Sequence, residues 1–156
     1  MLKNINKNIK ILYVEDDEIA RENGVEYLQN FFEQIYEASD AIKALQLYEK
    51  YQPDIIITDI QMPKLNGLEF VKRIRQKDKK TQVIIITAFS DKDYLLKAIE
   101  LGLVKYLVKP VREKEFEEAL FLCINALEKD ETNIIQLDEI TFFDTFNKNI
   151  FIKNHF

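Results

Sequence analysis

Short apolar runs rich in β-branched residues alternate along this chain with stretches of helical period. Continuous runs of about four to six apolar residues mark strands buried on both faces, the pattern of a parallel sheet covered by helices. We expect strands near 9–14, 34–38, 54–58, 82–87 and 104–108, and helices near 17–32, 40–51, 66–77, 91–101 and 112–129. Five strands alternating with five helices predict an α/β fold, a doubly wound parallel sheet with right-handed crossovers.

Polar side chains suited to binding phosphate or metal follow four of these strands. They are Glu15 and Asp16 after the first strand, Asp59 after the third, Thr87 at the end of the fourth and Lys109 after the fifth. Parallel strands bring their carboxyl ends to one edge of the sheet, where open α/β sheets place their ligand sites. We therefore expect these side chains to line one pocket.

The acids of this set predict a magnesium site. Mg²⁺ takes hard oxygen ligands and accepts one or two carboxylates while it keeps water and phosphate oxygens. Glu15, Asp16 and Asp59 would supply such a half-shell. The alternative is that the acids from Glu15 to Glu18 only cap the helix that follows, since acids are favourable at helix N-termini. Asp17 and Glu18 fit that alternative best.

Asp59 has the chemistry of a nucleophile toward phosphate. Its carboxylate can attack a phosphoryl group to give an acyl phosphate, and the metal offsets the charge that would repel the incoming group. Lys109 can pair with Asp59 at rest and with a phosphoryl oxygen afterwards. Thr87 offers a hydroxyl, and Ala88 beside it leaves room for the phosphoryl group. Taken singly, Asp59 could equally be an N-cap and Thr87 a β-forming residue.

Composition fits one α/β domain with a small addition. The chain has 156 residues, of which 47% are hydrophobic and 31% charged, so disorder is not expected. A formal charge of -5 gives no basic footprint for nucleic acid, and a single cysteine, Cys123, excludes an intrachain disulfide. No stretch approaches the roughly 20 apolar residues of a membrane span. We expect a cytoplasmic protein that does not enter a membrane.

Four stretches of sequence carry a resemblance to a known family. They are ILYVEDD from residue 11, IIITDIQMPKLNG from residue 55, VIIITA from residue 83 and GLVKYLVKP from residue 102. In this order and spacing they resemble the receiver domain of two-component response regulators, over residues from about 9 to 128. The resemblance implies a flavodoxin-like sheet in the order 2-1-3-4-5 and a signalling switch rather than a turnover enzyme.

The resemblance also implies a role for each residue of the pocket. Asp59 would be the phosphoacceptor, which takes a phosphoryl group from a phosphohistidine on a sensor histidine kinase. Asp16 would bind Mg²⁺ directly, Glu15 would hold it through water, and the backbone carbonyl of Gln61 would complete the protein ligands. Lys109 and Thr87 would bind phosphoryl oxygens.

Signal output in the family uses the face formed here by residues 91–101, 104–108 and 112–129. Tyr106 would turn inward when Thr87 and Ala88 move, although a half-buried strand aromatic is the plainer interpretation of this tyrosine. Phe89, two residues after Thr87, stands where the family controls access of water. A bulky side chain there predicts slow self-dephosphorylation.

The output face departs from the winged-helix subfamily of transcription regulators, whose receivers pair through charged residues there. Val104 and Lys105 begin the fifth strand, and Ala119 and Phe121 occupy places where arginines are expected. These departures argue against dimerisation by that salt-bridge scheme, although a homodimer through the face itself stays open.

The last helix carries more apolar residues than one buried stripe needs. A core-facing stripe is expected from Phe116, Leu120, Cys123, Ile124 and Leu127. Phe121 and Leu122 fall off this stripe, so they form either a partner surface or a surface that the tail covers.

We divide the chain into a receiver domain over residues 1–129 and a β-rich tail over residues 130–156. The polar break from Asp130 to Asn133 separates them, and short strands or hairpins are expected beyond it. The tail resembles the strand platform that precedes the helix-turn-helix of winged-helix effectors. On that view the chain is a fragment cut inside an effector, and DNA binding would require an effector absent from this chain.

We consider three functions for this chain, of which the last fits its residues least. The first is a receiver with a transcriptional output, and the second is a stand-alone receiver that acts on protein partners through Phe121 and Leu122. The third is an aspartate-nucleophile phosphatase of the haloacid dehalogenase type. That family needs a second acid two residues after its nucleophile, where this chain has Gln61.

Overall fold

The fold is a single parallel sheet flanked by helices, seen in a computed structural model that describes residues 2, 5, 8–88, 92–102 and 105–132. In chain order the elements are β1 (Lys10–Val14), α1 (Glu18–Leu28), β2 (Gln34–Ala38), α2 (Ala41–Tyr51), β3 (Ile55–Thr58), α3 (Gly67–Arg75), β4 (Gln82–Thr87), α4 (Lys92–Glu100), β5 (Lys105–Val108) and α5 (Glu113–Thr132). The five strands pair in parallel in the order β2-β1-β3-β4-β5. The expected fold class and strand order are confirmed.

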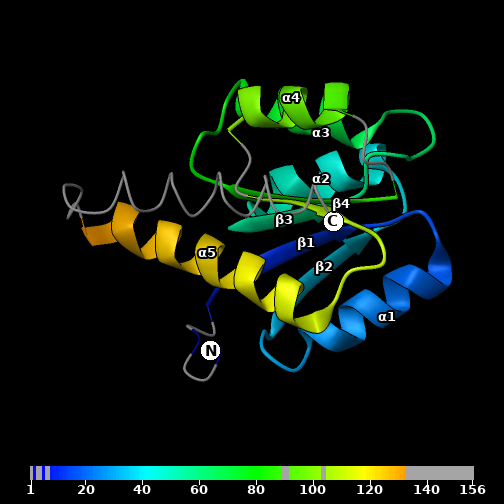
Figure 1. Cartoon of the computed structure of the whole chain (residues 1–156). Coiled ribbons are helices and arrows are strands. Elements are labelled where there is room, and N and C mark those ends of the chain that lie inside the picture. Colours follow the sequence, from blue (N-terminus) through cyan, green and yellow to red (C-terminus); the bar gives the residue numbers. More distant parts are fainter. Residues whose placement is uncertain (1, 3–4, 6–7, 89–91, 103–104, 133–156) are drawn as a thin grey trace.

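Two hydrophobic cores lie on opposite faces of the sheet (Figure 1). Helices α2, α3 and α4 cover one face, and α1 and α5 cover the other. Successive side chains of a strand point to opposite faces. Leu12 and Ile56 therefore enter the first core, and Ile11, Ile55 and Ile57 enter the second. This double burial explains why the central strands are apolar at almost every position.

Two helix ends differ from the expectation. Helix α1 ends at Leu28 rather than near residue 32, because the chain tightens into a turn in which the Asn30 and Phe31 amides donate to carbonyls three residues back. Phe32 is nevertheless buried, so its apolar character reflects packing of the turn. Helix α5 continues to Thr132, since neither glycine nor proline interrupts residues 130–132.

Helix α5 crosses the domain boundary that we expected between residues 129 and 130. The first three residues of the segment that we assigned to the tail belong to this helix, so a polar break does not begin at residue 130. The strands or hairpins expected further on fall on residues 133–156, outside the described residues. Within the part of the chain that the structure describes, no helix combines the length and the apolar character needed to cross a membrane.

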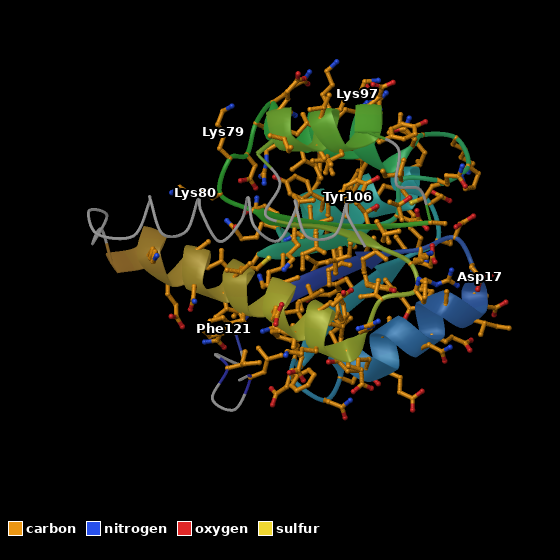
Figure 2. The ribbon with its side chains drawn as sticks, in the orientation of Figure 1. Asp17, Lys79, Lys80, Lys97, Tyr106 and Phe121 are labelled. Carbon is orange, nitrogen blue, oxygen red and sulfur yellow. The ribbon has the colours of Figure 1, made fainter. Side chains whose placement is uncertain are left out.

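The apolar stripe of α5 is confirmed. Its first four members are buried and Leu127 packs partly buried against the second core. Phe121 is 38% exposed, as expected for a residue off the stripe (Figure 2). Leu122 differs, because it is partly buried and also packs against the second core.

Candidate functional site

The sheet ladder sets two carboxylates side by side at its carboxyl edge. The Glu15 amide donates to the carbonyl of Ala38, and the Asp59 amide donates to the carbonyl of Val14, at 3.0 and 3.2 Å. These bonds continue the strand pairing by one residue beyond β1 and β3. Glu15 is only 3% exposed and Asp59 only 8% exposed, so both acids lie in a largely dry environment.

Lys109 bridges these two acids. Its Nζ donates to Oε1 of Glu15 at 2.7 Å and to Oδ2 of Asp59 at 2.8 Å. The backbone amide of Lys109 donates to the carbonyl of Thr87 at 2.8 Å, which fixes the start of the loop after β5. Burial alone would lower the pKa of Lys109, but the bonds to Asp59 and Glu15 outweigh it and raise that pKa well above its usual value. The lysine is therefore a permanent cation between two acids.

Three acids and one lysine make up what we call the acidic pocket: Glu15, Asp16, Asp59 and Lys109. Carboxylate oxygens of the three acids all lie within 4.8 Å of one another. Burial raises the pKa of Glu15, and the hydrogen bond from Lys109 only partly opposes this. Oε2 of Glu15 has no hydrogen-bond partner among the described residues. A buried oxygen without a donor, beside two further carboxylates, suits a hard divalent cation such as Mg²⁺.

The alternative that the acids from Glu15 to Glu18 only cap a helix is right for the last two of them. Oδ1 of Asp17 accepts a hydrogen bond from the Ala20 amide at 2.8 Å, so Asp17 is the N-cap of α1, and Glu18 lies in the first helical turn. Glu15 and Asp16 instead belong to the cluster with Asp59. The four consecutive acids therefore divide between the pocket and the helix.

The loop between β3 and α3 holds the Asp59 carboxylate from its other side. The amide of Gln61 donates to Oδ1 of Asp59 at 3.1 Å, while Lys109 contacts Oδ2. Asn66 caps α3 through the Glu69 amide, and the Gly67 amide donates to the carbonyl of Ile60 at 2.8 Å. Asp59 is thus fixed by groups from two different loops.

Gly67 is a site residue whose function the sequence reasoning missed. A Cβ at this position would lie 1.9 Å from the backbone oxygen of Asp59, a distance that no side chain could accept. The start of α3 therefore approaches the pocket as closely as it does only because residue 67 is glycine. The Asn-Gly pair before an apolar helix was the available sequence signal, but it indicates only a helix start.

Tyr13 is a second missed residue. It lines the small cavity beneath the pocket together with Glu15, Asp59 and Lys109. Burial, followed by the nearby Glu15 charge, raises the pKa of Tyr13 to about 12, so the phenol stays protonated. As a strand tyrosine between Leu12 and Val14, it gave no sign of this position in the sequence.

The remaining expected residues lie in or next to β4 and β5, apart from Gln61 in the loop between β3 and α3. Thr87 is fully buried and Ala88 is exposed. Tyr106 is 5% exposed and belongs to the first core, so it is buried rather than half-buried (Figure 2). Gln61 is exposed at the surface of its loop. Phe89 and Val104 lie outside the described residues.

Known sequences resemble this chain over most of its length. A family model for the response regulator receiver domain matches residues 11–121. An uncharacterized response regulatory protein of Staphylococcus epidermidis is 33% identical over 121 residues, or 76% of this chain and 47% of that protein. The transcriptional regulatory protein BtsR of Salmonella typhi is 33% identical over 129 residues, or 81% and 53%. The chain thus spans about half the length of the curated relatives it matches.

Solved structures agree with this assignment. The N-terminal domain of an uncharacterized protein from Wolinella succinogenes matches with a TM-score of 0.70 and 43% identity, and the match covers 74% of this chain and 93% of that one. The signal receiver domain of an HD domain-containing protein from Pseudomonas fluorescens Pf-5 matches with a TM-score of 0.74 and 28% identity, over 78% and 98%. The chain therefore belongs to the response regulator receiver family, signalling proteins whose general function is phosphorylation-dependent switching.

Proposed function

We propose that Asp59 accepts a phosphoryl group from a phosphohistidine on a sensor histidine kinase in a Mg²⁺-dependent reaction. In this step a carboxylate oxygen of Asp59 forms a bond to phosphorus while the bond from phosphorus to the histidine nitrogen breaks. The observation that carries the proposal is the position of Asp59, a buried carboxylate 2.8 Å from the Lys109 ammonium and within 4.8 Å of two further acids.

Magnesium binding follows from the same cluster. Asp16 would bind the ion directly, Glu15 through water, and the backbone carbonyl of Gln61 would complete the protein ligands. Bound there, Mg²⁺ would offset the charge of the phosphoryl group and of the acids. The pocket carries three carboxylates and one ammonium group, so it has the negative charge that such an ion needs.

Lys109 and Thr87 would bind the phosphoryl oxygens after transfer. The Lys109 ammonium is already 2.8 Å from Asp59, and the Lys109 amide donates to the carbonyl of Thr87. A displacement of Lys109 would therefore also shift Thr87. We propose that Thr87 and Ala88 pass the change to Tyr106 and to the face built from α4, β5 and α5. A phosphoryl group would act there by favouring one of two arrangements.

A single experiment tests the phosphoacceptor. The purified chain is incubated with Mg²⁺ and acetyl phosphate, and intact mass spectrometry should show one added phosphoryl group. Asp59→Asn should abolish the addition, because an amide is not a nucleophile toward phosphate. Asp40→Asn is the matched control, since Asp40 caps α2 and asparagine caps equally well. Phosphoryl addition that persists in Asp59→Asn would refute the assignment.

The output of this switch is a separate proposal. Relatives such as BtsR are named transcriptional regulators, and the match covers only 53% of BtsR. We propose that this receiver likewise controls transcription, with DNA contacted only through an effector outside the chain. The protein would act in the cytoplasm, where its kinase presents the phosphohistidine.

The alternative output is binding to protein partners or to a second copy of the chain. It is favoured by exposed apolar side chains on two helices of the output face, namely Leu96 and Ile99 on α4 and Phe121 on α5, which are 48%, 43% and 38% exposed. Gel filtration with and without beryllofluoride separates the outcomes. A monomer in both states would argue against output by dimerisation.

Slow self-dephosphorylation stays a prediction, because it rests on Phe89. A bulky side chain there should restrict the approach of water to the acyl phosphate. Phe89→Ala should therefore shorten the half-life of the phosphorylated chain, measured by the decay of the added mass. A wild-type half-life of seconds would contradict the prediction.

A further inference from the structure

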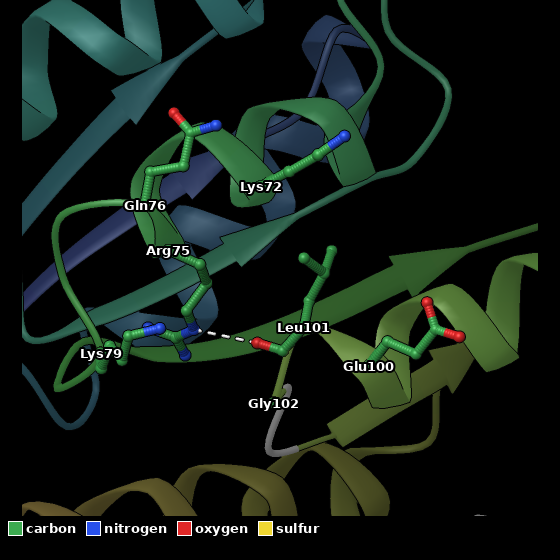
Figure 3. A pocket seen from close by; sticks show the side chains of 7 residues that line it. All are labelled: Lys72, Arg75, Gln76, Lys79, Glu100, Leu101 and Gly102. Carbon is green, nitrogen blue, oxygen red and sulfur yellow. Dashed lines mark hydrogen bonds between the residues drawn. The ribbon is translucent and has the colours of Figure 1, made fainter.

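Cationic side chains gather at a groove between α3 and α4, which we call the basic groove. Its main cavity has a volume of about 450 Å³ and is lined by Lys72, Arg75, Lys79, Glu100 and Leu101, among others (Figure 3). A second cavity of about 300 Å³ shares Lys72, Glu100 and Leu101 with the first and adds Lys97 and Glu69, so lysines and acids balance there and the excess positive charge lies in the main cavity. The groove thus continues along both helices.

The basic groove lies at the opposite edge of the sheet from the acidic pocket. Lys79 is three residues before Gln82, where β4 begins, and Leu101 is four residues before Lys105, where β5 begins. Both belong to the amino ends of these strands, whereas Asp59 and Lys109 follow carboxyl ends. A ligand in the basic groove would therefore not contact the residues proposed to bind phosphate and Mg²⁺.

Arg75 is fixed in this groove by backbone carbonyls and forms no ion pair with any acid that the structure describes. Its Nε donates to the carbonyl of Leu101 at 3.1 Å (Figure 3). Its Nη1 donates to the carbonyl of Asp78 at 3.2 Å. Both acceptors are neutral, and no ion pair joins Arg75 to a carboxylate among the described residues. Burial lowers the pKa of this guanidinium, and the field of Asp78 only partly opposes it. A half-buried cation of this kind is stabilised by an anion.

The Asp78 carboxylate is close to Arg75 but is occupied by other donors. Oδ2 accepts from the Tyr48 hydroxyl and from the Thr81 hydroxyl, each at 2.6 Å. Oδ1 accepts from the amides of Lys80 and Thr81, at 2.8 and 3.0 Å. These four bonds fix the loop between α3 and β4, and with it the carbonyl of Asp78 that positions the guanidinium.

The surrounding lysines add positive charge that no ion pair within the described residues neutralises. Lys72, Lys79 and Lys97 are exposed and form no ion pair within the described part of the chain. Figure 2 shows Lys79 and Lys97 at the surface. Residues 72–80 contain six lysines and arginines and one acid, in a chain whose formal charge is -5. The helix dipole favours cations in the last turn of α3, but Lys77, Lys79 and Lys80 lie beyond that helix.

We propose that the basic groove binds a small phosphate-bearing ligand. The volume falls within the range of ligand cavities, roughly 300–1,000 Å³. A guanidinium fork held by backbone carbonyls is suited to phosphate oxygens, and Lys72 and Lys79 beside it can neutralise a second phosphate group. The side chain of Leu101 gives the groove an apolar patch for the remainder of the ligand.

Calorimetric titration tests the proposal with two probes, sodium tripolyphosphate and ADP, on the full chain in EDTA. Both should bind saturably. The double variant Lys72→Glu and Lys79→Glu should weaken binding at least about tenfold, because each change replaces an attraction with a repulsion. The control is Lys43→Glu with Lys114→Glu, which makes the same change of net charge at exposed lysines away from the groove. The affinity of this control variant for either probe should change less than about twofold.

Further measurements separate a specific site from general attraction. Amide NMR shifts on titration should centre on Lys72, Arg75 and Gly102, and Asp59→Asn should bind both probes as the wild type does. Equal weakening by the groove and control variants, shifts centred on Lys109, or no saturation at millimolar probe would each overturn the proposal. Tighter binding of an oligoglutamate peptide than of either phosphate probe would overturn it in favour of a protein partner.

Discussion

The acidic pocket and the basic groove are built at opposite edges of the same sheet and by different means. In the pocket, ladder bonds place Glu15 and Asp59 next to each other, and a single lysine contacts both. In the groove, one arginine is fixed by carbonyl oxygens while the lysines extend from helices and a loop. Charged groups at the strand ends are therefore held at defined positions. The lysines on helix ends and loops mainly add net positive charge.

The largest expected effect distinguishes the two sites by the sign of the charge on the ligand that each binds. Asp16→Asn should weaken Mg²⁺ binding by about tenfold to a hundredfold, because it removes a carboxylate from a site that needs hard anionic oxygens. Titration calorimetry measures the affinity. The double groove variant Lys72→Glu and Lys79→Glu should leave Mg²⁺ affinity nearly unchanged, and an equal loss in both proteins would mean that the sites are not independent.

A smaller effect compares one glycine from each site. Gly67→Ala should lower the free energy of unfolding by about 1–3 kcal/mol, since the added Cβ meets the Asp59 backbone. Gly102→Ala should cost only about 1 kcal/mol, because φ is +68° there but no atom lies within 4 Å of the added carbon.

Urea unfolding measures both values. Gly102→Asn should recover most of the loss at residue 102, since asparagine tolerates the left-handed region, whereas Gly67→Asn should not recover the loss at residue 67. An equal loss of unfolding free energy in Gly67→Ala and Gly102→Ala would contradict the view that a Cβ collision acts at residue 67 and only backbone strain at residue 102.

The smallest effect concerns two carboxyl groups whose pKa values move in opposite directions. Burial alone would raise the pKa of Asp78, but hydrogen bonds from Thr81 and Tyr48 outweigh it and lower the pKa to about 2 from an ordinary 3.8. A lowered pKa stabilises the fold above 3.8, and this contribution is lost as pH falls from 3.8 toward 2. Glu15, with a raised pKa, has the opposite dependence.

Asp78→Asn should therefore reduce stability at pH 6 by about 1 kcal/mol after allowance for solvent screening, and the difference from wild type should shrink as the pH falls below 4. Unfolding free energies of the two proteins across this range check the prediction. A difference that stays constant with pH would show that the Asp78 charge does not contribute. Asp17→Asn, which keeps the N-cap of α1, serves as the control.

The sheet and the acidic pocket could be predicted because their signals are local. Apolar runs determine the strands, and a residue that follows a strand must lie at the sheet edge, so Asp59 and Lys109 could be placed without a structure. Gly67 and Tyr13 could not, because their importance lies in contacts between distant segments. The Cβ clash at residue 67 depends on how closely α3 approaches β3.

The basic groove was missed for a different reason. A net charge of -5 concealed it, because composition averages over a surface on which residues 72–80 have the opposite sign. Helix ends were also misjudged. Phe32 has the period of α1 but packs as part of a turn, and the acids after Lys129 indicated a break where α5 continues to Thr132.

Helix α5 has a mechanical consequence for any signal that reaches it. It begins four residues after Lys109, and its 20 residues give a length of about 30 Å. Its last turns extend beyond the ends of the strands (Figure 1). A rigid rod of this length converts a tilt of about 5° at its first turn into a displacement of about 2–3 Å at its far end. Sub-ångström adjustment around the lysine can thus become ångström-scale displacement at the end of the helix.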